Sequence, residues 1–193
     1  MKDYSQHGES RFLYNYIKKH NIDVNKLFID IGALDGITNS NSRIFLEDGW
    51  RGILFEPNPY SFSKLIKNIN GLNVEYYNAA ITDKIAPITF NIVTKKNFEG
   101  HSSISQNGKH KVLGVTLDTI ISTKRKIGIL DIDAEGHDTI IVKNIINSGF
   151  SPMFIIIEAA RMDERNKQVQ FLEQKGYKLI NTIKPNTIWE RIS

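Results

Sequence analysis

Acidic side chains and one histidine cluster in the second half of the sequence, where they could accept a proton or bind a ligand. Asp133, His137 and Asp138 follow one apolar segment, and Glu158 ends the next. If these segments are neighbouring parallel strands, their carboxyl ends meet at one edge of a sheet, and Glu158 lies beside Asp133. Two carboxylates could orient a hydroxyl, act as a base or hold a divalent ion, and histidine titrates near neutral pH. Some of these acids could instead only cap a helix. The candidate catalytic residues are Asp133, His137 and Glu158.

Candidate binding residues follow two apolar segments in the first third of the chain. One segment leads into a loop with Gly32, Asp35 and Gly36, and the next leads into Glu56 and Pro57. Glu56 follows the loop at roughly the 20-residue spacing of an acid that accepts hydrogen bonds from a ribose. The loop lacks the G-x-G-x-x-G pattern, and an acid there repels a pyrophosphate but suits an ammonium or a sulfonium. S-Adenosyl-L-methionine carries both groups and no phosphate. A plain strand-to-turn junction and a helix cap are the simpler alternatives.

A third apolar segment ends at Asn78 and Ala79. Small side chains at this point would leave room for a flat adenine, and the Asn78 amide could bond its edge. Tight packing between a sheet and a helix would require the same small residues, so both interpretations stay open.

Apolar segments that end at these acids alternate with amphipathic segments. We expect strands over residues 26–31, 51–56, 74–78, 127–133 and 153–158, and helices over residues 10–20, 40–48, 60–70, 137–147 and 163–175. Residues 177–183 and 187–192 should form an antiparallel hairpin around Pro185 and Asn186. This order predicts an α/β protein with a Rossmann-like, doubly wound, mostly parallel sheet. The C-terminal antiparallel hairpin distinguishes the class I methyltransferase fold from the dinucleotide-binding fold.

The alternation of apolar and amphipathic segments is interrupted over residues 83–121. We interpret this stretch as an insertion between two units of the sheet. Strands are expected at 88–94 and 111–117, a short helix at 117–121, and a polar stretch between the strands. Glycines at 100 and 108 would allow this insertion to act as a mobile lid over an acceptor. No repeat or linker divides the chain, so we predict one domain over residues 1–193.

Composition excludes several kinds of protein. The 193 residues contain no cysteine, which rules out disulfide scaffolds, thiolate zinc sites and cysteine nucleophiles. The net charge of +4 comes from scattered lysines and arginines, so a nucleic-acid partner is not expected. No apolar run reaches the roughly 20 residues of a membrane span, and the N-terminus lacks the apolar stretch of a signal peptide. The sequence therefore predicts a soluble, cytoplasmic protein.

The motifs together resemble those of the FkbM-type methyltransferases of the class I S-adenosylmethionine-dependent superfamily. The matching segments are YSQHGE (4–9), FIDIGALDGIT (28–38), GWRGILFEPNP (49–59), HSSI (101–104), TLD (116–118) and LDIDAEGHD (130–138). Each segment is short, but their joint order is specific. One departure is Asp138, where the family more often has a glutamate.

The resemblance implies methyl transfer from S-adenosyl-L-methionine, usually to a hydroxyl oxygen of a sugar or secondary metabolite. By position, Asp30, Gly32, Asp35 and Gly36 would hold the methionine part of the cofactor, and Glu56 its ribose. With the residues beside them, the predicted cofactor-binding residues are Asp30, Gly32, Ala33, Asp35, Gly36, Glu56, Pro57, Asn78 and Ala79. The expected partner is a small-molecule or glycan acceptor. We assign no metal ligand.

For the chemistry we expect in-line displacement at the sulfonium methyl, with a base that removes the acceptor's proton. His137, Asp133 or Glu158 could be that base, and His101 in the insertion is the next candidate. Two rivals remain. A nicotinamide-dependent oxidoreductase shares the acid after the second strand, but the missing glycine pattern and the hairpin count against it. A non-catalytic cofactor-binding module would not need the acids at the fourth strand.

Overall fold

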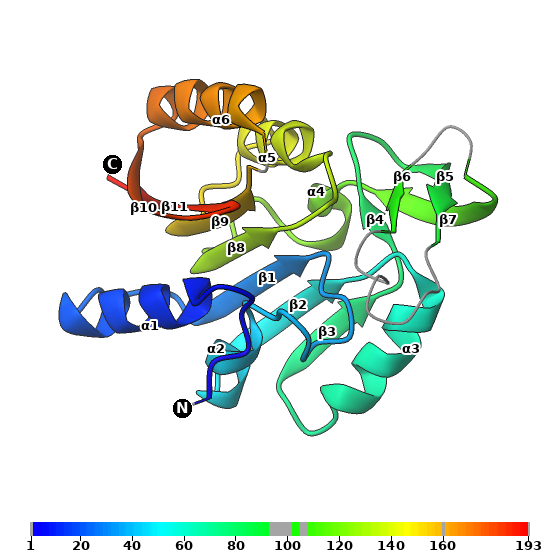
Figure 1. The fold of residues 1–193 in the computed structure, drawn as a ribbon, viewed down its shortest axis with the longest axis horizontal. Helices are drawn as coiled ribbons and strands as arrows, with labels where there is room; N and C mark the ends of the chain where they lie inside the picture. Colours follow the sequence, from blue (N-terminus) through cyan, green and yellow to red (C-terminus); the bar gives the residue numbers. More distant parts are fainter. Residues whose placement is uncertain (1, 93–101, 105–107, 160, 193) are drawn as a thin grey trace.

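The computed structural model describes residues 2–92, 102–104, 108–159 and 161–192 of the chain (Figure 1). The helices are α1 (Glu9–Lys19), α2 (Arg43–Glu47), α3 (Pro59–Asn68), α4 (Leu117–Ile120), α5 (Asp138–Asn147) and α6 (Met162–Gln174). The strands are β1 (Leu27–Ile31), β2 (Arg51–Phe55), β3 (Val74–Tyr77), β4 (Ala80–Ile81), β5 (Ala86–Asn91), β6 (Ser103–Ile104), β7 (His110–Val115), β8 (Ile129–Ile132), β9 (Phe154–Glu158), β10 (Tyr177–Ile183) and β11 (Asn186–Arg191). Within this part of the chain, no helix has the length and apolar character that crossing a membrane requires.

The central sheet has seven strands in the order β10-β11-β9-β8-β1-β2-β3. Strands β3, β2, β1, β8 and β9 are parallel, whereas β11 runs antiparallel to both β9 and β10. The chain winds outward from β1 to β3 and then returns to place β8 on the other side of β1. The predicted fold class is confirmed, and the switch point between β1 and β8 is where ligands bind in such sheets.

Helices cover both faces of this sheet, which explains why its central strands are apolar on both sides. On one face, α1 and α2 pack on a cluster that includes Phe28, Ile129 and Phe154. On the other face, α5 and α6 cover a larger cluster around Ile29 and Leu130. The first cluster ends at Phe28 and Ile129, which Asp30 and Asp131 follow on the same face, whereas the second cluster continues to Ile31 and Ile132.

A second sheet, ordered β4-β7-β5-β6, lies beside the carboxyl edge of the first (Figure 1). Much of it comes from residues 83–121, where β5, β7 and α4 occupy nearly the predicted positions. Strands β4 and β6 were not expected, because two residues are too few to show an alternating pattern. Residues 93–101, including Gly100 and His101, and residues 105–107 lie outside the described part.

Helix α2 is shorter than predicted, because the polar residues before it point inward. The Ser42 hydroxyl donates to the Asp30 carboxylate at 2.5 Å, and the Ser40 hydroxyl accepts from the Arg43 backbone N–H at 3.2 Å. Asn39 is left-handed with φ of 55°, a conformation that asparagine tolerates better than most residues. Residues 39–42 therefore form a loop rather than a first helical turn, with Ser40, Asn41 and Ser42 buried.

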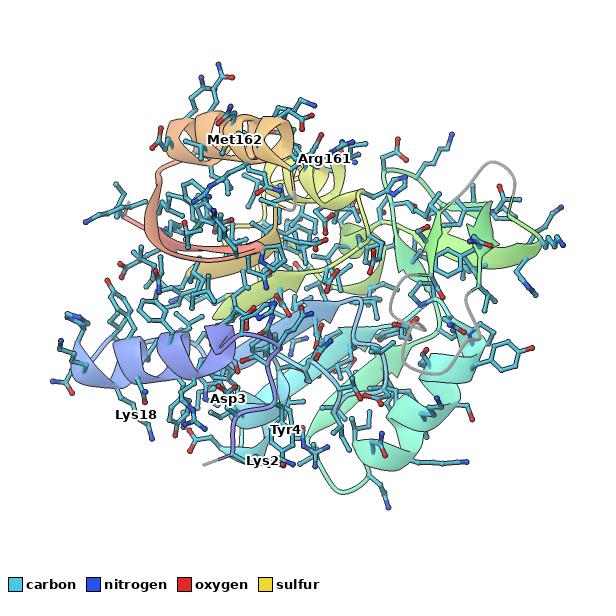
Figure 2. The ribbon with its side chains drawn as sticks, in the orientation of Figure 1. Lys2, Asp3, Tyr4, Lys18, Arg161 and Met162 are labelled. Atoms are coloured by element: carbon cyan, nitrogen blue, oxygen red, sulfur yellow. The ribbon has the colours of Figure 1, made fainter. Side chains whose placement is uncertain are left out.

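The N-terminal segment runs along α1 and α2 toward the same edge of the sheet. Figure 2 shows Asp3 and Tyr4 between these helices, and the Tyr4 hydroxyl donates to Glu47 at 2.9 Å. Asp3 accepts from both the backbone N–H and the hydroxyl of Ser5, and Ser5 pairs with Asn39 in a parallel bridge. These contacts hold the residues after Ser5 against the loop that follows β1.

The first prediction concerns Gly32, which lies at the switch point with φ of +95°. A Cβ there would overlap the backbone carbonyl oxygen of Asp133, which cannot move without shifting β8. We expect Gly32→Ala to lower the free energy of unfolding by more than about 3 kcal/mol or to prevent folding. The measurement is urea unfolding followed by circular dichroism.

Gly49→Ala is the matched control. Gly49 has φ of +81°, but no described atom lies within 4 Å of an added Cβ. This variant carries the backbone cost alone, about 1–2 kcal/mol. Equal losses in the two variants would show that the approach of Gly32 to Asp133 contributes nothing.

Candidate functional site

A cavity of about 550 Å³ opens at the carboxyl edge of the parallel strands. Acidic side chains dominate its polar lining: Asp30, Asp35, Glu56, Asp131, Asp133, Glu135 and Glu158. Among the described lining residues, Lys64 is the one with a basic side chain. Further wall comes from Gln6 of the N-terminal segment, Pro185 of the hairpin, and Phe90, Ser102 and Ile104 of the second sheet. The cavity is therefore strongly acidic, although the chain as a whole is basic.

Glu56 ties the loop after β1 to the end of β2. Its carboxylate accepts the backbone N–H of Leu34 at 2.9 Å and that of Asn58 at 2.7 Å. Leu34 has φ of 51°, which costs a branched residue about 1–2 kcal/mol and which this hydrogen bond offsets. Burial raises the pKa of Glu56 to about 8, although both N–H groups act in the opposite direction. The two bonds hold the loop and fix the carboxylate at the cavity wall.

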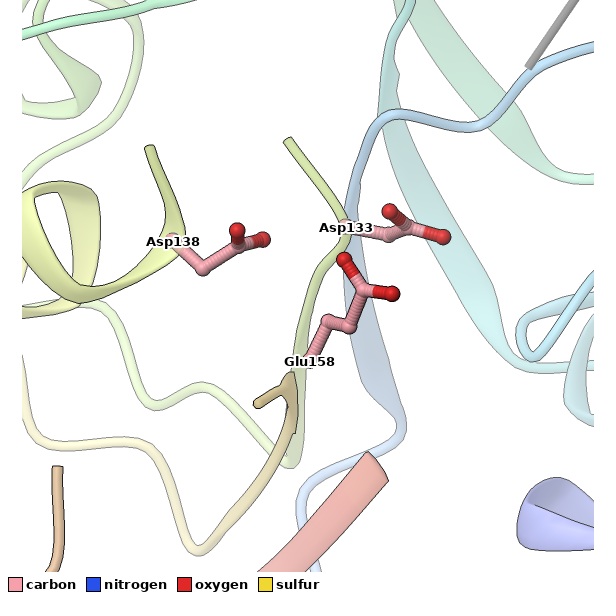
Figure 3. Close-up of side chains that lie close together, drawn as sticks. All are labelled: Asp133, Asp138 and Glu158. Atoms are coloured by element: carbon pink, nitrogen blue, oxygen red, sulfur yellow. The ribbon is translucent and has the colours of Figure 1, made fainter. Parts of the chain in front are cut away.

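Three carboxyl groups meet where β8 and β9 end (Figure 3). Oxygen atoms of Asp133, Asp138 and Glu158 lie within 4.8 Å of one another. The prediction that Glu158 lies beside Asp133 is confirmed. Asp133 lines the cavity and its side chain is accessible from it, and loss of hydration and then repulsion from Glu158 raise its pKa well above the usual range. A carboxylate with a raised pKa is better suited to accept a proton near neutral pH.

Asp138 differs from the other two because its carboxylate belongs to the turn that precedes α5. Its two oxygens accept the backbone N–H groups of Ala134 at 2.7 Å and Gly136 at 3.0 Å. Glu135 and Gly136 in this turn both have positive φ, so the turn depends on such bonds. Three carboxylates this close would suit a divalent cation. Because Asp138 already serves the turn, we assign it to positioning Asp133 and Glu135 rather than to a metal.

Comparison with known proteins identifies the family to which this chain belongs. Residues 30–179 match the family described as the methyltransferase FkbM domain. The chain belongs to the FkbM methyltransferase family, and it is a methyltransferase. No curated protein sequence matches it.

Solved structures with the same fold cover nearly all of this FkbM methyltransferase. Precorrin-6y C5,15-methyltransferase from Geobacter metallireducens GS-15 is 15% identical, with a TM-score of 0.51 over 100% of this chain and 93% of its own. The human methyltransferase 10 domain containing protein is 13% identical, with a TM-score of 0.52 over 95% and 83% of the two chains. A chain of the fibrillarin/Nop5p complex is 16% identical, with a TM-score of 0.51 over 97% and 81%. At these identities the likeness establishes the class I methyltransferase fold.

Some of the predicted binding residues of this methyltransferase line the cavity, and others are not among its described lining residues. Those that line the cavity are Asp30, Gly32, Ala33, Asp35, Glu56, Pro57 and Ala79. The Asp35 carboxylate accepts from the backbone N–H groups of Ile37 and Thr38, at 2.9 and 2.7 Å, so it also closes its own loop. Gly36 and Asn78 are not among the described lining residues. The Asn78 amide instead donates to the backbone carbonyls of Glu56 and Pro57. Their roles toward a cofactor stay predictions.

His137 is also not among the described residues that line the cavity. It precedes α5, and its Nδ1 is buried and finds no hydrogen-bond partner in the described part of the chain. Of the predicted catalytic residues, the structure thus brings Asp133 and Glu158 together in the cavity and does not place His137 among the described lining residues.

The sequence analysis assigned Asp30 to the cofactor but missed Asp131, which pairs with it, and the polar side chains that contact the two acids. Asp30 and Asp131 are paired in register on β1 and β8 and are nearly fully buried at the cavity wall. Ser42 donates to Asp30, and the Asn41 amide donates to Asp131 at 3.3 Å. Burial raises the pKa of Asp30 to about 6, and burial and then the Asp30 charge raise that of Asp131. The signal was the polar run at 39–42, placed between a glycine loop and an apolar helix.

The second prediction compares Asp138, which bonds the turn before α5, with Asp133, which lines the cavity. Asp138→Asn leaves one backbone N–H facing an amide NH₂, and we expect a loss of about 1–3 kcal/mol in the free energy of unfolding. Asp133→Asn removes a charge that burial and Glu158 disfavour, so at pH 7 it should not destabilise the fold. Urea unfolding of both variants at pH 7 tests the difference. A loss in Asp133→Asn as large as in Asp138→Asn would contradict it.

Proposed function

We propose that this methyltransferase transfers a methyl group from S-adenosyl-L-methionine to a hydroxyl oxygen of a small-molecule or glycan acceptor. The observation that carries the proposal is the acidic cavity at the switch point, with Glu56 on one wall and Asp133 and Glu158 on another. Residues that would hold the cofactor and residues that could serve the acceptor thus share one cavity.

The residues present fit this cofactor in size and charge. A volume of about 550 Å³ falls within the range of small-molecule pockets, roughly 300–1,000 Å³. The acidic lining favours a ligand with a sulfonium and an ammonium and disfavours the pyrophosphate of a nicotinamide dinucleotide. The Glu56 carboxylate has lone pairs beyond its two backbone bonds, so it could still accept a ribose hydroxyl. These features support the methyltransferase proposal over the oxidoreductase alternative.

The bound cofactor would supply a methyl group already activated by its positive sulfur. The protein would align the acceptor hydroxyl with that methyl and remove the hydroxyl proton. Asp133 is our candidate for the base because its pKa is raised and it lies in the cavity. Glu158 would hold the acceptor hydroxyl beside it, and His137 remains the alternative base.

The acceptor side of the cavity supports a small, non-phosphorylated acceptor. Asp133, Glu135 and Glu158 line it, and phosphate groups close to them would be repelled. Phe90 and Ile104 of the second sheet and Ser102, which precedes β6, also line the cavity, so residues 83–121 supply part of its cover. A short RNA belongs in the acceptor panel as the outcome that would overturn this part of the proposal.

The third prediction is that S-adenosylmethionine and S-adenosylhomocysteine bind with micromolar dissociation constants, whereas NAD and NADP do not bind measurably. The reason is the charge of the cavity. Isothermal titration calorimetry with the full chain tests it. Equal or tighter binding of a dinucleotide would falsify the assignment of the cofactor.

The fourth prediction concerns the base. We expect Asp133→Asn to lower turnover about 10²–10⁴-fold, the usual cost of losing a general base, with little change in cofactor affinity. His137→Ala should stay within a few-fold of the wild type. Turnover is measured with labelled S-adenosylmethionine and a panel of glycans and hydroxylated metabolites.

Asp23→Asn and His110→Ala are matched controls, since both residues are exposed and neither is among the lining residues. A large loss in His137→Ala, with Asp133→Asn unaffected, would instead assign the base to His137.

A further inference from the structure

One buried amide bonds the end of β9 from the side of α6. Gln168 is only 1% exposed, and its Nε2 donates to the backbone carbonyl oxygen of Glu158 at 2.7 Å. The same Nε2 donates to the Thr139 hydroxyl at 3.2 Å. A carbonyl oxygen can only accept, so the NH₂ group of the amide must face Glu158. Both N–H donors of the amide are therefore used.

The acceptor of the same amide is not satisfied. The Oε1 of Gln168 is buried and has no hydrogen-bond partner in the described part of the chain. A buried carbonyl oxygen without a donor is costly, and an apolar side chain of the same size would avoid that cost. The position of the groups that Gln168 bonds therefore explains the amide better than stability does.

The peptide unit between Glu158 and Ala159 is bonded on both sides. Gln168 donates to its carbonyl oxygen, and its N–H donates to the backbone carbonyl oxygen of Pro185 at 3.0 Å. A peptide unit is planar and has one donor and one acceptor, so these two bonds fix its orientation. That orientation helps to set the direction in which the Glu158 side chain leaves the end of β9.

The second contact of Gln168 lies on the segment that carries the opposing carboxyl groups. Thr139 is in the first turn of α5 and directly follows Asp138. Oxygen atoms of Asp133, Asp138 and Glu158 lie within 4.8 Å of one another (Figure 3), and the charges of Asp133 and Glu158 repel each other. One amide thus joins two segments that this repulsion drives apart.

We propose that Gln168 is a positioning residue that holds Glu158 beside Asp133 for methyl transfer. The inference rests on the proposed function, in which Asp133 accepts the proton of the acceptor hydroxyl and Glu158 holds that hydroxyl. Gln168 is not among the described residues that line the cavity, so it acts through Glu158 rather than on a ligand.

The pKa of Asp133 reports the position of Glu158 without any methyl acceptor. Loss of hydration and then repulsion from Glu158 raise this pKa, so a Glu158 carboxylate that moves away lowers it. The other carboxyl groups that act on Asp133 do not bond to Gln168, and they are Asp30, Asp131, Glu135 and Asp138. The measurement is a ¹³C NMR titration of the full chain with labelled aspartate, in which Asp133→Asn assigns the signal.

Gln168→Met keeps the length of the side chain and removes its donors. We expect it to lower the pKa of Asp133 by at least half of the decrease that Glu158→Gln produces, because the end of β9 can then move away. Thr139→Val removes the second partner of the amide and should lower the pKa by a smaller amount, which keeps the test decisive if Gln168→Met folds poorly. Gln170→Met is the matched control, since Gln170 is an exposed glutamine on the same helix. It should leave the pKa of Asp133 unchanged.

The outcomes separate this inference from the proposed function, because calorimetry with S-adenosylhomocysteine is run on the same wild type. If the wild type binds this ligand but the Gln168 and Thr139 variants leave the pKa of Asp133 unchanged or raise it, the proposed function stands and the positioning role is wrong. A lower free energy of unfolding with an unchanged pKa would assign Gln168 to fold stability alone. If the wild type does not bind S-adenosylhomocysteine, the proposed function fails and the role in methyl transfer fails with it.

Discussion

The loss of hydration by carboxyl groups that gather at one edge of a parallel sheet is the constraint around which this molecule is organised. Parallel strands have their carboxyl ends at the same edge of the sheet. Four acids lie at that edge and line the cavity: Asp30, Glu56, Asp131 and Asp133. The pKa of each is raised, with burial as the first cause. For such groups stability is fully present below the unfolded pKa and is lost as pH rises through the folded pKa. For Glu56 that window runs from about 4.5 to about 8. A cationic ligand would offset part of this loss by pairing with the carboxylates.

Unusual backbone conformations in the loops allow these carboxylates to lie close together. Gly32 allows β1 to turn against the backbone of Asp133, and Leu34 adopts a left-handed conformation that its bond to Glu56 stabilises. Two further acids, Asp35 and Asp138, are bonded to N–H groups of their own turns. Carboxylates of the same chemistry therefore have different structural roles. Asp138 serves its turn alone, whereas Asp35 and Glu56 both accept loop N–H groups and line the cavity.

Segments far apart in the chain complete the cavity. Gln6 reaches it along α1 and α2, and Pro185 reaches it from the turn between β10 and β11. These two approaches are linked through Glu9, whose carboxylate accepts from the His7 backbone N–H at 2.9 Å and from the Asn186 amide at 2.6 Å. The second sheet adds Phe90 and Ile104 to the lining. The main sheet is the part shared with other class I methyltransferases, and these additions enclose the cavity at its carboxyl edge.

The sequence by itself determined the architecture and half of the candidate site. Period-two and helical patterns act over a few residues, so they located the strands of the main sheet, the hairpin, and the acids at the ends of β1, β2, β8 and β9. Spacing along the chain was enough to expect Glu158 beside Asp133, because adjacent parallel strands end together. The tertiary structure alone decided the pairing of Asp30 with Asp131, the burial of Asn41 in the cavity wall and the absence of His137 from the described lining residues. These depend on register between strands about a hundred residues apart and on which face a loop side chain buries, and no local pattern records either. Strands β4 and β6 were missed for the same reason, since two residues form a strand only when a distant partner is already in place.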